Sequence, residues 1–455
     1  MTTHTEINPQ TKEKITRLLQ DKQYSEAVEL ILTLHPADQA KLYQDLLSEQ
    51  QKSLLSHLEI EEIADLFDEL DDQSTYNAAK KLPVQFLADI IDDMDPDEAA
   101  DLLGDLSGQD VRRTISMMED PDNVLPLLRY PDDTAGGRMT TDFLVLEPDE
   151  NAGHAIEYLR KVGPESDVPY YLYVIDEEGR LVGITGLREL VIAAPQLPVS
   201  AIMDAHVISI EAMRDQEEAA RLMVHYDLSA LPVVDQMSRL VGVISHDDIL
   251  DVMEDETTED IYRLASVTDA ALEPESKVLH QLQGRLPWLL LNTLTALFGA
   301  WIISNFEDLF IQVAVLAFFQ SVVAAQGGNA ASQNVAMIVR SLALGKVDIN
   351  KVWPILMRQL IVGMFLGVVV GMIVGVGVGL WQQNPYLGLV LGLALLGNMI
   401  VASVIGTLAP LVLELLGQDP AMASSVLVTA MTDSLGFLIF LSLARAFLPL
   451  IRQFV

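Results

Sequence analysis

Long apolar segments in the C-terminal part of the chain constrain its fold most. Residues 359–413 contain no Asp, Glu, Lys or Arg over 55 positions, and only the polar turn WQQNPY interrupts them. Because about 20 apolar residues suffice for one helix to cross a bilayer, this stretch predicts two spans. Residues 286–306, 311–339 and 421–448 raise the expected number to five. The sequence therefore predicts a multidomain membrane protein in which residues 281–455 form a five-helix transmembrane domain.

The distribution of basic residues predicts the orientation of these spans. Arg340, Lys346, Lys351 and Arg358 cluster between the second and third spans, whereas the WQQNPY turn carries no charge. Under the positive-inside rule this cluster belongs in the cytoplasm. The first residues, MTTHTEINPQTKEK, contain no apolar stretch typical of a signal peptide. We expect a multi-pass protein of the cell (plasma or inner) membrane, with a cytoplasmic N-terminus and the C-terminus outside.

One carboxylate, Asp433, lies near the middle of the last apolar segment. Placing Asp at the centre of a spanning helix costs about 2.5–3.5 kcal/mol on insertion scales, so such a residue marks a polar pathway within the helix bundle. An ion pair with a basic residue is the alternative, but no Lys or Arg lies at a similar depth in another predicted span. The sequence therefore predicts that Asp433 binds a cation from solution.

Oxygen-bearing groups accompany this carboxylate. The segment QGGNAASQN of the second span contains two adjacent glycines, which predict a break in the helix. Irregular backbone at membrane depth is tolerated only where it is buried or faces water. A small hard cation such as Mg²⁺ takes oxygen ligands, and no His or Cys lies in the predicted spans to select a softer metal. The candidate pore residues are Asp433, Thr429, Thr432, Ser425, Gly328, Asn329 and Gln333.

The third span carries a stripe of small residues. Gly363, Gly367, Gly371 and Gly375 recur at every fourth position and so lie on one face of a helix. Small residues at this interval let two helix backbones approach closely. The stripe predicts tight packing against a neighbouring span.

The charge of the chain is confined to its first 270 residues. The chain contains 65 acidic and 28 basic residues, and only eight of each follow residue 270, which leaves 57 acidic and 20 basic residues before it. Such an excess excludes nucleic acid and anionic lipid as partners of this part. It favours cations, although an acidic surface that only keeps the protein soluble is the alternative. Cysteine is absent, which excludes disulfides and cysteine-ligated zinc.

Residues 1–130 are predicted to form an all-α domain. Segments such as IEEIADLFDEL and PVQFLADIIDDM place apolar residues three and four positions apart between Pro, Gly and Asp. Helices this short cannot bury a face alone, so we expect them to stack into a superhelix. Asp92, Asp95 and Asp97 concentrate negative charge in this domain, and a solvated helix face is the alternative interpretation of that cluster.

An internal repeat follows. The segment YYLYVIDEEGRLVGITGLREL recurs as SALPVVDQMSRLVGVISHDDIL, with Arg180 and Arg239 equivalent and 59 residues apart. Each copy predicts two strands joined by a turn and followed by a helix. The pair resembles tandem α/β CBS domains, with boundaries at residues 131–200 and 201–262. Such modules commonly dimerise and hold adenine nucleotides, so the resemblance implies ATP near Tyr171, Arg188 and Glu189 as a possible ligand site.

A strongly acidic helix joins the repeat to the first span within residues 248–280. Asp248, Asp251, Asp255 and Glu259 follow one another at intervals of three, four and four, which places them on one helical face. Like charges at this spacing destabilise a helix by a few tenths of a kcal/mol per pair. A bound cation would offset that repulsion. We expect the apolar residues of the helix to be buried, namely Ile249, Val252, Met253, Ile261 and Leu264.

The order of these parts, together with YPDDTAGGRMTTDF, TEDIYRLASV and DPAMASSVLVTAMTDSLGFL, resembles the MgtE family of magnesium transporters. The resemblance implies a homodimer with a pore between its subunits, a plug helix at residues 248–280, and a hydrated Mg²⁺ held by Asp433. It also implies regulatory Mg²⁺ sites in the cytoplasmic part. The positions that match these sites are Asp92, Asp95, Asp97, Glu217, Asp227, Asp248, Asp251, Glu256, Glu259 and Asp260.

The expected function is a magnesium-gated magnesium channel for Mg²⁺ uptake, closed when Mg²⁺ binds the acidic cytoplasmic domains. Its expected partners are a second copy of the chain, membrane lipid and Mg²⁺, without nucleic acid. Two alternatives stay open: a transporter of the same architecture for Co²⁺ or Mn²⁺, and a membrane-anchored nucleotide sensor that transports nothing. An enzyme is not expected, because the eight histidines form no HExxH motif and no nucleophile elbow is present.

Overall fold

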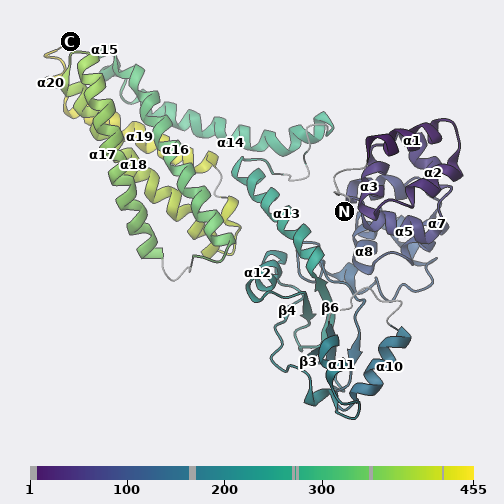
Figure 1. The fold of residues 1–455 in the computed structure, drawn as a ribbon. Coiled ribbons are helices and arrows are strands. Elements are labelled where there is room, and N and C mark those ends of the chain that lie inside the picture. The colour runs from purple at the N-terminus through teal and green to yellow at the C-terminus, as the bar shows by residue number, and fades with distance from the viewer. Residues whose placement is uncertain are drawn as a thin grey trace. The chain divides into compact units, whose positions relative to one another are not determined.

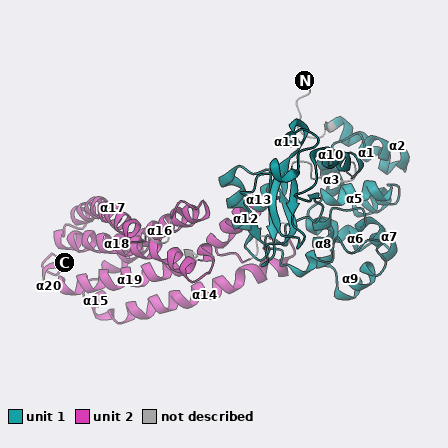
Figure 2. Ribbon diagram, turned by 90° about the horizontal axis from the view of Figure 1, so that it is seen from below, with its two compact units in different colours: residues 1–252 teal, residues 253–455 magenta. Residues whose placement is uncertain are grey.

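The computed structural model of the 455-residue chain describes residues 8–162, 171–268, 272, 276–347, 352–422 and 425–454. The chain divides into two compact units, Met1–Val252 and Met253–Val455. Figure 2 colours them separately, and Figure 1 follows the chain through both. Each unit is described by itself.

The first unit begins with the predicted superhelix of short helices. α3 packs on α5, α5 on α7 and α7 on α9, while α6 packs on α8, so most of these helices contact the next but one along the chain. This stacking confirms the all-α superhelical domain. The helices are α1 (Pro9–Gln20), α2 (Tyr24–Ile31), α3 (Pro36–Gln44), α4 (Ser48–Leu55), α5 (Ile60–Asp68), α6 (Asp72–Ala79), α7 (Val84–Ile91), α8 (Pro96–Asp105) and α9 (Gly108–Ile115), followed by the 3-10 turn η1 (Leu127–Arg129).

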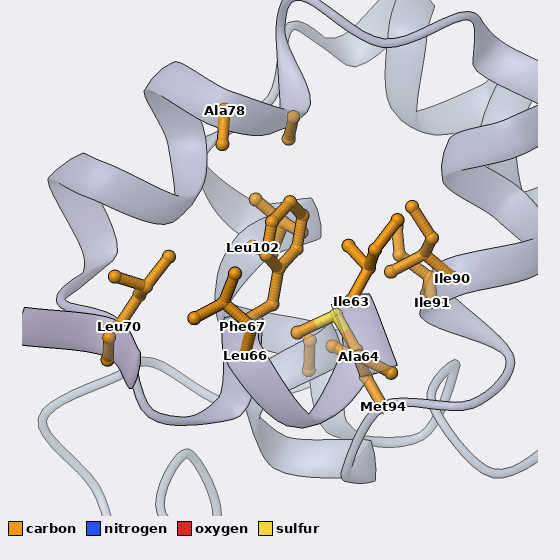
Figure 3. Packing of buried hydrophobic residues seen from close by; sticks show 14 of the residues in the cluster. Ile63, Ala64, Leu66, Phe67, Leu70, Ala78, Ile90, Ile91, Met94 and Leu102 are labelled. Atoms are coloured by element: carbon orange, nitrogen blue, oxygen red, sulfur yellow. The ribbon is translucent and has the colours of Figure 1, made fainter. Parts of the chain in front are cut away.

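Buried apolar side chains hold these helices together. In Figure 3, Ile63 and Phe67 of α5 point toward side chains of neighbouring helices that include Ile90 and Leu102. Ile63, Phe67 and Ile90 are 0% exposed. Because burying one large apolar side chain contributes about 1.5–3 kcal/mol, contacts between helices stabilise elements that are too short to persist alone.

A repeat of 24 residues underlies this stacking. The segment ADLFDELD at 64–71 recurs as ADIIDDMD at 88–95, which makes Asp68 equivalent to Asp92. Asp68 Oδ1 accepts the backbone N–H of Asp95 at 3.4 Å, and Asp92 Oδ2 accepts that of Glu119 at 2.7 Å. In both cases donor and acceptor lie 27 residues apart. An aspartate at the equivalent position of each repeat thus links successive layers of the superhelix.

The duplicated segment forms two small sheets, as expected. In each, a two-residue strand pairs parallel with a longer strand, which pairs antiparallel with the next. The two short strands, β1 and β4, are not visible in the sequence pattern. The elements are β1 (Val145–Leu146), α10 (Ala152–Val162), β2 (Tyr171–Ile175), β3 (Leu181–Gly186), α11 (Leu187–Ile192), the 3-10 turn η3 (Val199–Ala201), β4 (Ile210–Glu211), α12 (Gln216–Tyr226), β5 (Ala230–Val234) and β6 (Leu240–Ser245).

The equivalence of Arg180 and Arg239 is confirmed by their positions. They form an antiparallel β-bridge with each other, so the turns of the two copies meet. Within each turn the arginine Nε donates to an aspartate four residues earlier, from Arg180 to Asp176 and from Arg239 to Asp235, both at 2.8 Å. The repeated DxxxR motif therefore shapes the turn through which the two copies contact each other.

The acidic helix α13 (His246–Leu264) begins in the first unit and ends in the second. Ile249 and Val252 are buried as expected, at 1% and 0% exposure. The predictions for Met253 and Ile261 are wrong for the single chain, because these side chains are 41% and 59% exposed. Beyond Val252 the helix leaves the core of the first unit. Leu264, in its last turn, packs against an apolar cluster of the second unit.

The second unit is a bundle of long helices. Within its described residues, four helices are long and apolar enough to cross a membrane: α14, α17, α18 and α19. α16 has 28 residues but falls outside this group, so its membrane span stays a prediction. The elements are α14 (Val278–Ser304), α15 (Glu307–Gln312), α16 (Leu316–Ala343), α17 (Val352–Trp381), α18 (Pro385–Leu415), the 3-10 turn η5 (Pro420–Met422), α19 (Ser425–Ala446) and α20 (Leu448–Ile451).

The predicted break in the second span is wrong. α16 is helical without interruption from Leu316 to Ala343, including QGGNAASQN. Its two glycines serve close packing. A methyl group on Gly327 would lie 2.7 Å from Cγ of Asn398 in α18, and one on Gly328 would lie 3.0 Å from Cγ2 of Thr429 in α19. Glycine therefore removes side-chain bulk here and leaves the helical backbone intact.

The glycine stripe of α17 packs as predicted. A methyl group on Gly371 would lie 2.5 Å from the carbonyl oxygen of Gly392, and one on Gly375 would lie 2.7 Å from that of Gly388. Glycines from both helices therefore bring the α17 and α18 backbones into direct contact.

Candidate functional site

Asp433 lies in the ninth position of α19 and is half-buried. Its Oδ1 atom is enclosed and accepts no hydrogen bond from any described residue. A buried acceptor without a partner costs about 1–3 kcal/mol, and more when it is charged. The second unit therefore contains an available carboxylate oxygen within an apolar helix that is long enough to cross a membrane.

The glycine pair of α16 lies beside this part of α19. Gly328 packs against Thr429, which precedes Asp433 by four residues and so lies on the same face of α19. The structure thus brings three of the predicted pore residues close together. Thr429 is half-buried and stands one turn from the carboxylate.

The remaining predicted pore residues differ in their positions. Thr432 is 0% exposed, and its hydroxyl donates to the carbonyl oxygens of Val428 and Thr429 at 3.1 and 2.9 Å. The Thr432 hydroxyl proton is therefore used in hydrogen bonds within α19. Asn329 and Gln333 are exposed in the single chain, one turn apart on α16. Ser425 begins α19, and its side chain lies outside the described residues.

A second candidate site lies in the first unit, at the start of α8. Asp95 is the N-cap residue of this helix, and Asp97 lies in its first turn. Burial, followed by repulsion from Asp248, raises the pKa of Asp97 to about 7. Asp248 lies in the first turn of α13, accepts the backbone N–H of Ser245 at 3.2 Å and also accepts its hydroxyl proton. Three of the predicted regulatory residues are therefore grouped, and their charges oppose one another.

The structure adds acidic residues that are absent from the predicted regulatory sites. Burial, and then the neighbouring charge of Asp95, raise the pKa of Asp68 to about 8. Burial, and then Asp97, raise that of Glu98 to about 9. Burial raises the pKa of Asp101 to about 7, even though Arg138 Nη1 lies 3.9 Å away. The 24-residue repeat was the signal that could have revealed Asp68, because it aligns this residue with Asp92.

Other predicted regulatory residues of the first unit lie in different surroundings. The carboxylate of Asp92 accepts backbone N–H groups of Glu119 and Asp120, at 2.7 and 3.3 Å, and so holds a loop. Glu217 lies 3.5 Å from Arg221. Asp227 ends α12 in the left-handed conformation, with φ of 55°. Within the described residues, no group of three or more His, Asp or Glu side chains is arranged to hold a metal ion.

The acidic face of α13 continues into the second unit. Asp251 lies one turn after Asp248 and contributes to raising the pKa of that carboxyl, for which burial is the main cause. Further along, burial and then Glu256 raise the pKa of Asp260 to about 6, while Arg340 of α16 opposes them. Negative charge therefore extends along the helix from its first turns to its last.

Two ion pairs join the end of α13 to a later part of the second unit. Arg263 pairs with Glu259 on its own helix and with Asp419, which lies just before η5. All three side chains are about one-third exposed or less. One arginine therefore joins the last turn of the acidic helix to the connection between α18 and α19.

The predicted nucleotide residues lie at one end of the first small sheet. Tyr171 pairs across strands with Gly186, and α11 begins directly afterwards with Arg188 and Glu189 in its first turn. The hydroxyl of Thr185, a residue that is 2% exposed, has no hydrogen-bond partner among the described residues. This arrangement places Tyr171, Arg188 and Thr185 at the same end of β2 and β3, and so brings together an aromatic residue, a basic residue and a hydroxyl.

Comparison with known proteins matches each part of the chain. A family profile described as "Divalent cation transporter" matches residues 320–443, and one described as "MgtE intracellular N domain" matches residues 34–133. The CBS domain profile matches residues 135–195 and 199–255.

Whole proteins give the same assignment. The "Magnesium transporter MgtE" of Thermus thermophilus is 37% identical over 71% of this chain and 72% of its own length. The protein of that name from Bacillus subtilis is 32% identical over 96% of this chain and 97% of its own. A solved structure, the soluble part of a magnesium transporter, is 31% identical, with a TM-score of 0.50, and covers 54% of this chain and 98% of that one. The chain belongs to the MgtE family of magnesium transporters.

Proposed function

We propose that this protein carries Mg²⁺ across the membrane along α16 and α19, with Asp433 as the carboxylate that receives the ion. The observation that carries this proposal is the enclosed Oδ1 of Asp433, which lies without a hydrogen-bond partner among the described residues. Mg²⁺ keeps part of its water shell and binds through one or two carboxylates. Uptake needs no energy source besides the membrane potential, which supplies about 4.6 kcal/mol for two charges at 100 mV.

The polar face of α16 supports a homodimer with the pore between its subunits. Asn329 and Gln333 are exposed in the single chain, although α16 lies against the apolar helices α18 and α19. Amide side chains that face lipid have no hydrogen-bond partners. A second copy that meets this face would enclose it and create a polar path. In this arrangement α16 spans the membrane as well and completes the set of five spans, the N-terminus lies in the cytoplasm and the C-terminus lies outside.

The acidic residues of the cytoplasmic part form the proposed magnesium sensor. Carboxylates such as Asp97 and Asp248 are buried together and repel each other. Two carboxylates 4 Å apart repel by about 4 kcal/mol at an effective dielectric constant of 20. Oxygen ligands of this kind suit Mg²⁺, whose charge would offset the repulsion and favour the closed state. Without Mg²⁺ the same charges push the acidic faces apart.

Flux measurements on the full-length protein in proteoliposomes test the transport proposal. We expect Asp433→Asn to abolish entry of Mg²⁺ into vesicles loaded with a fluorescent indicator. Asp308→Asn, which neutralises an exposed carboxylate of α15, should conduct normally. Normal flux through the Asp433 variant would refute the proposed ion pathway. Competition by Co²⁺ and Mn²⁺ during the same assay would reveal a transporter for other divalent cations.

An adenine nucleotide is the second proposed ligand, at the end of β2 and β3. Tyr171 is half-buried, whereas Arg188 and Glu189 are exposed and accessible to a ligand. Equilibrium binding of radiolabelled ATP should weaken at least tenfold in Arg188→Ala and remain unchanged in Arg160→Ala, a substitution on α10. If ATP binds but no ion crosses the vesicle membrane, the protein is a nucleotide sensor and the transport proposal is wrong.

A further inference from the structure

A buried amide lies where three helices of the second unit meet. Asn398, in the middle of α18, is 1% exposed. Its Nδ2 donates a hydrogen bond of 2.7 Å to the carbonyl oxygen of Val323 in α16. This side chain therefore links two helices through a backbone atom, which cannot change its position by a rotamer change.

Two glycines create the space for this amide. A methyl group on Gly327 of α16 would lie 2.7 Å from Cγ of Asn398, and one on Gly436 of α19 would lie 2.8 Å from its Nδ2. Any other residue at either position would displace the amide. At this level of the bundle the same side chain therefore fills the contact of α18 with α16 and its contact with α19.

This crossing lies beside the proposed ion site. Gly436 follows Asp433 by three residues on α19, and Gly327 directly precedes Gly328, whose neighbour Thr429 stands one turn before Asp433. The Asn398 amide and the contact between Gly328 and Thr429 therefore define the spacing of α16 and α19 on either side of the carboxylate.

The Asn398 carbonyl oxygen argues against a role in packing alone. Oδ1 is enclosed and has no hydrogen-bond partner among the described residues. A leucine of similar size would leave no acceptor unsatisfied at this position, whereas a buried acceptor without a partner costs about 1–3 kcal/mol. Stability therefore does not account for an amide here.

We propose that Asn398 is a positioning residue for ion transport: by holding the Val323 carbonyl and filling the space between Gly327 and Gly436, it sets the spacing of α16 and α19 around Asp433. This inference rests on the proposed transport function. A wider distance between α16 and α19 would change how closely the walls of the pathway approach a hydrated ion. It would therefore change both the rate of Mg²⁺ transport and the preference of the pathway for one hydrated ion over another.

The test uses full-length Asn398→Leu in proteoliposomes. We expect Mg²⁺ flux at least tenfold below wild type, an altered ratio of Mg²⁺ to Co²⁺ flux, and a thermal midpoint in detergent within a few degrees of wild type. Asn384→Leu is the matched control. Asn384 is the N-cap residue of α18 and a 2% exposed amide that accepts the Leu387 N–H and donates to the Ile451 carbonyl at 2.9 Å. Its replacement should lower the thermal midpoint without altering the flux ratio.

A paired substitution provides rescue. Gly327→Ala should reduce flux because its methyl group meets the Asn398 amide, and adding Asn398→Ser should restore part of it by freeing that space. Asn398→Leu with wild-type flux and flux ratio would overturn the inference. So would a flux loss that only follows a lower thermal midpoint at an unchanged ratio. If Asp433→Asn still conducts, the proposed pathway itself fails, which is a separate outcome.

Discussion

Neutralising Asp68 should stabilise the magnesium-free superhelix in a pH-dependent way. Burial and the charge of Asp95 raise the pKa of Asp68 from 3.8 to about 8 in the folded protein. At neutral pH the folded state therefore holds a proton that the unfolded state releases. Asp68→Asn keeps an acceptor for the Asp95 N–H and removes the ionisation. The free energy of unfolding of the variant should therefore exceed that of the wild type by the cost of protonating Asp68 on folding.

The size and sign of this effect follow from the two pKa values. A group whose pKa is raised on folding costs nothing below its unfolded pKa, and its cost grows by about 1.4 kcal/mol per pH unit until the folded pKa is reached. For Asp68 the cost grows from about pH 4 to about pH 8 and is constant above that. Between pH 6 and pH 8 the advantage of the variant should increase by about 2 kcal/mol, because the slope flattens as the folded pKa is approached.

Amide hydrogen exchange on the full-length protein measures this advantage locally. Protection of α5 and α8 reports the free energy of opening the superhelix. In chelator, Asp68→Asn should protect both helices more than wild type, and the gain should be larger at pH 8 than at pH 6. Asp92→Asn makes the same chemical change at the equivalent repeat position, where the carboxylate holds a loop, and should reduce protection. An equal gain at both pH values, or a loss in Asp68→Asn, would refute this reasoning.

The remaining predictions concern the second unit and its connection to the acidic helix. Gly371→Ala should lower the thermal midpoint by several degrees, because its methyl group would meet the Gly392 carbonyl oxygen at 2.5 Å, whereas Gly377→Ala, with no neighbour within 4 Å, should leave it unchanged. Arg263→Met removes both ion pairs at the end of α13, so trypsin should cleave between α13 and α14 several times faster, and cleavage at the wild-type rate would contradict a tethering role for Arg263. Removing Mg²⁺ with a chelator should increase hydrogen exchange throughout α8 and α13, and unchanged exchange would argue against a magnesium sensor.

Much of the fold could be predicted because its signals are local. Alternating and apolar runs identified the longer strands, and the spacing of Arg180 and Arg239 identified the duplication. The two-residue strands β1 and β4 escaped detection because such a short strand has no periodicity of its own. Met253 and Ile261 were misassigned because helical periodicity shows which residues share a face but not whether another element covers that face.

The site was harder to predict because its partners are distant in sequence. Asp433 stood out as a lone carboxylate in an apolar segment. The glycines of α16 were interpreted as helix breakers, since the sequence does not show that Asn398 and Thr429 occupy the space that a side chain would fill. Asp68 was missed because Asp95, the charged neighbour that raises its pKa most, lies 27 residues later in the sequence. Only stacking of the superhelix brings those carboxylates together.

The contact between α17 and α18 also limits how this protein can move. Where two backbones touch through glycine, no side chain can change rotamer to let one helix slide past the other. α17 and α18 should therefore move as one rigid body. α14 packs less closely, because only 6% of its most apolar 18-residue segment is buried within the chain. Opening and closing would then depend on shifts of the other helices against this pair, and substitutions that alter gating should map to α14, α16 and α19 rather than to the glycines between α17 and α18.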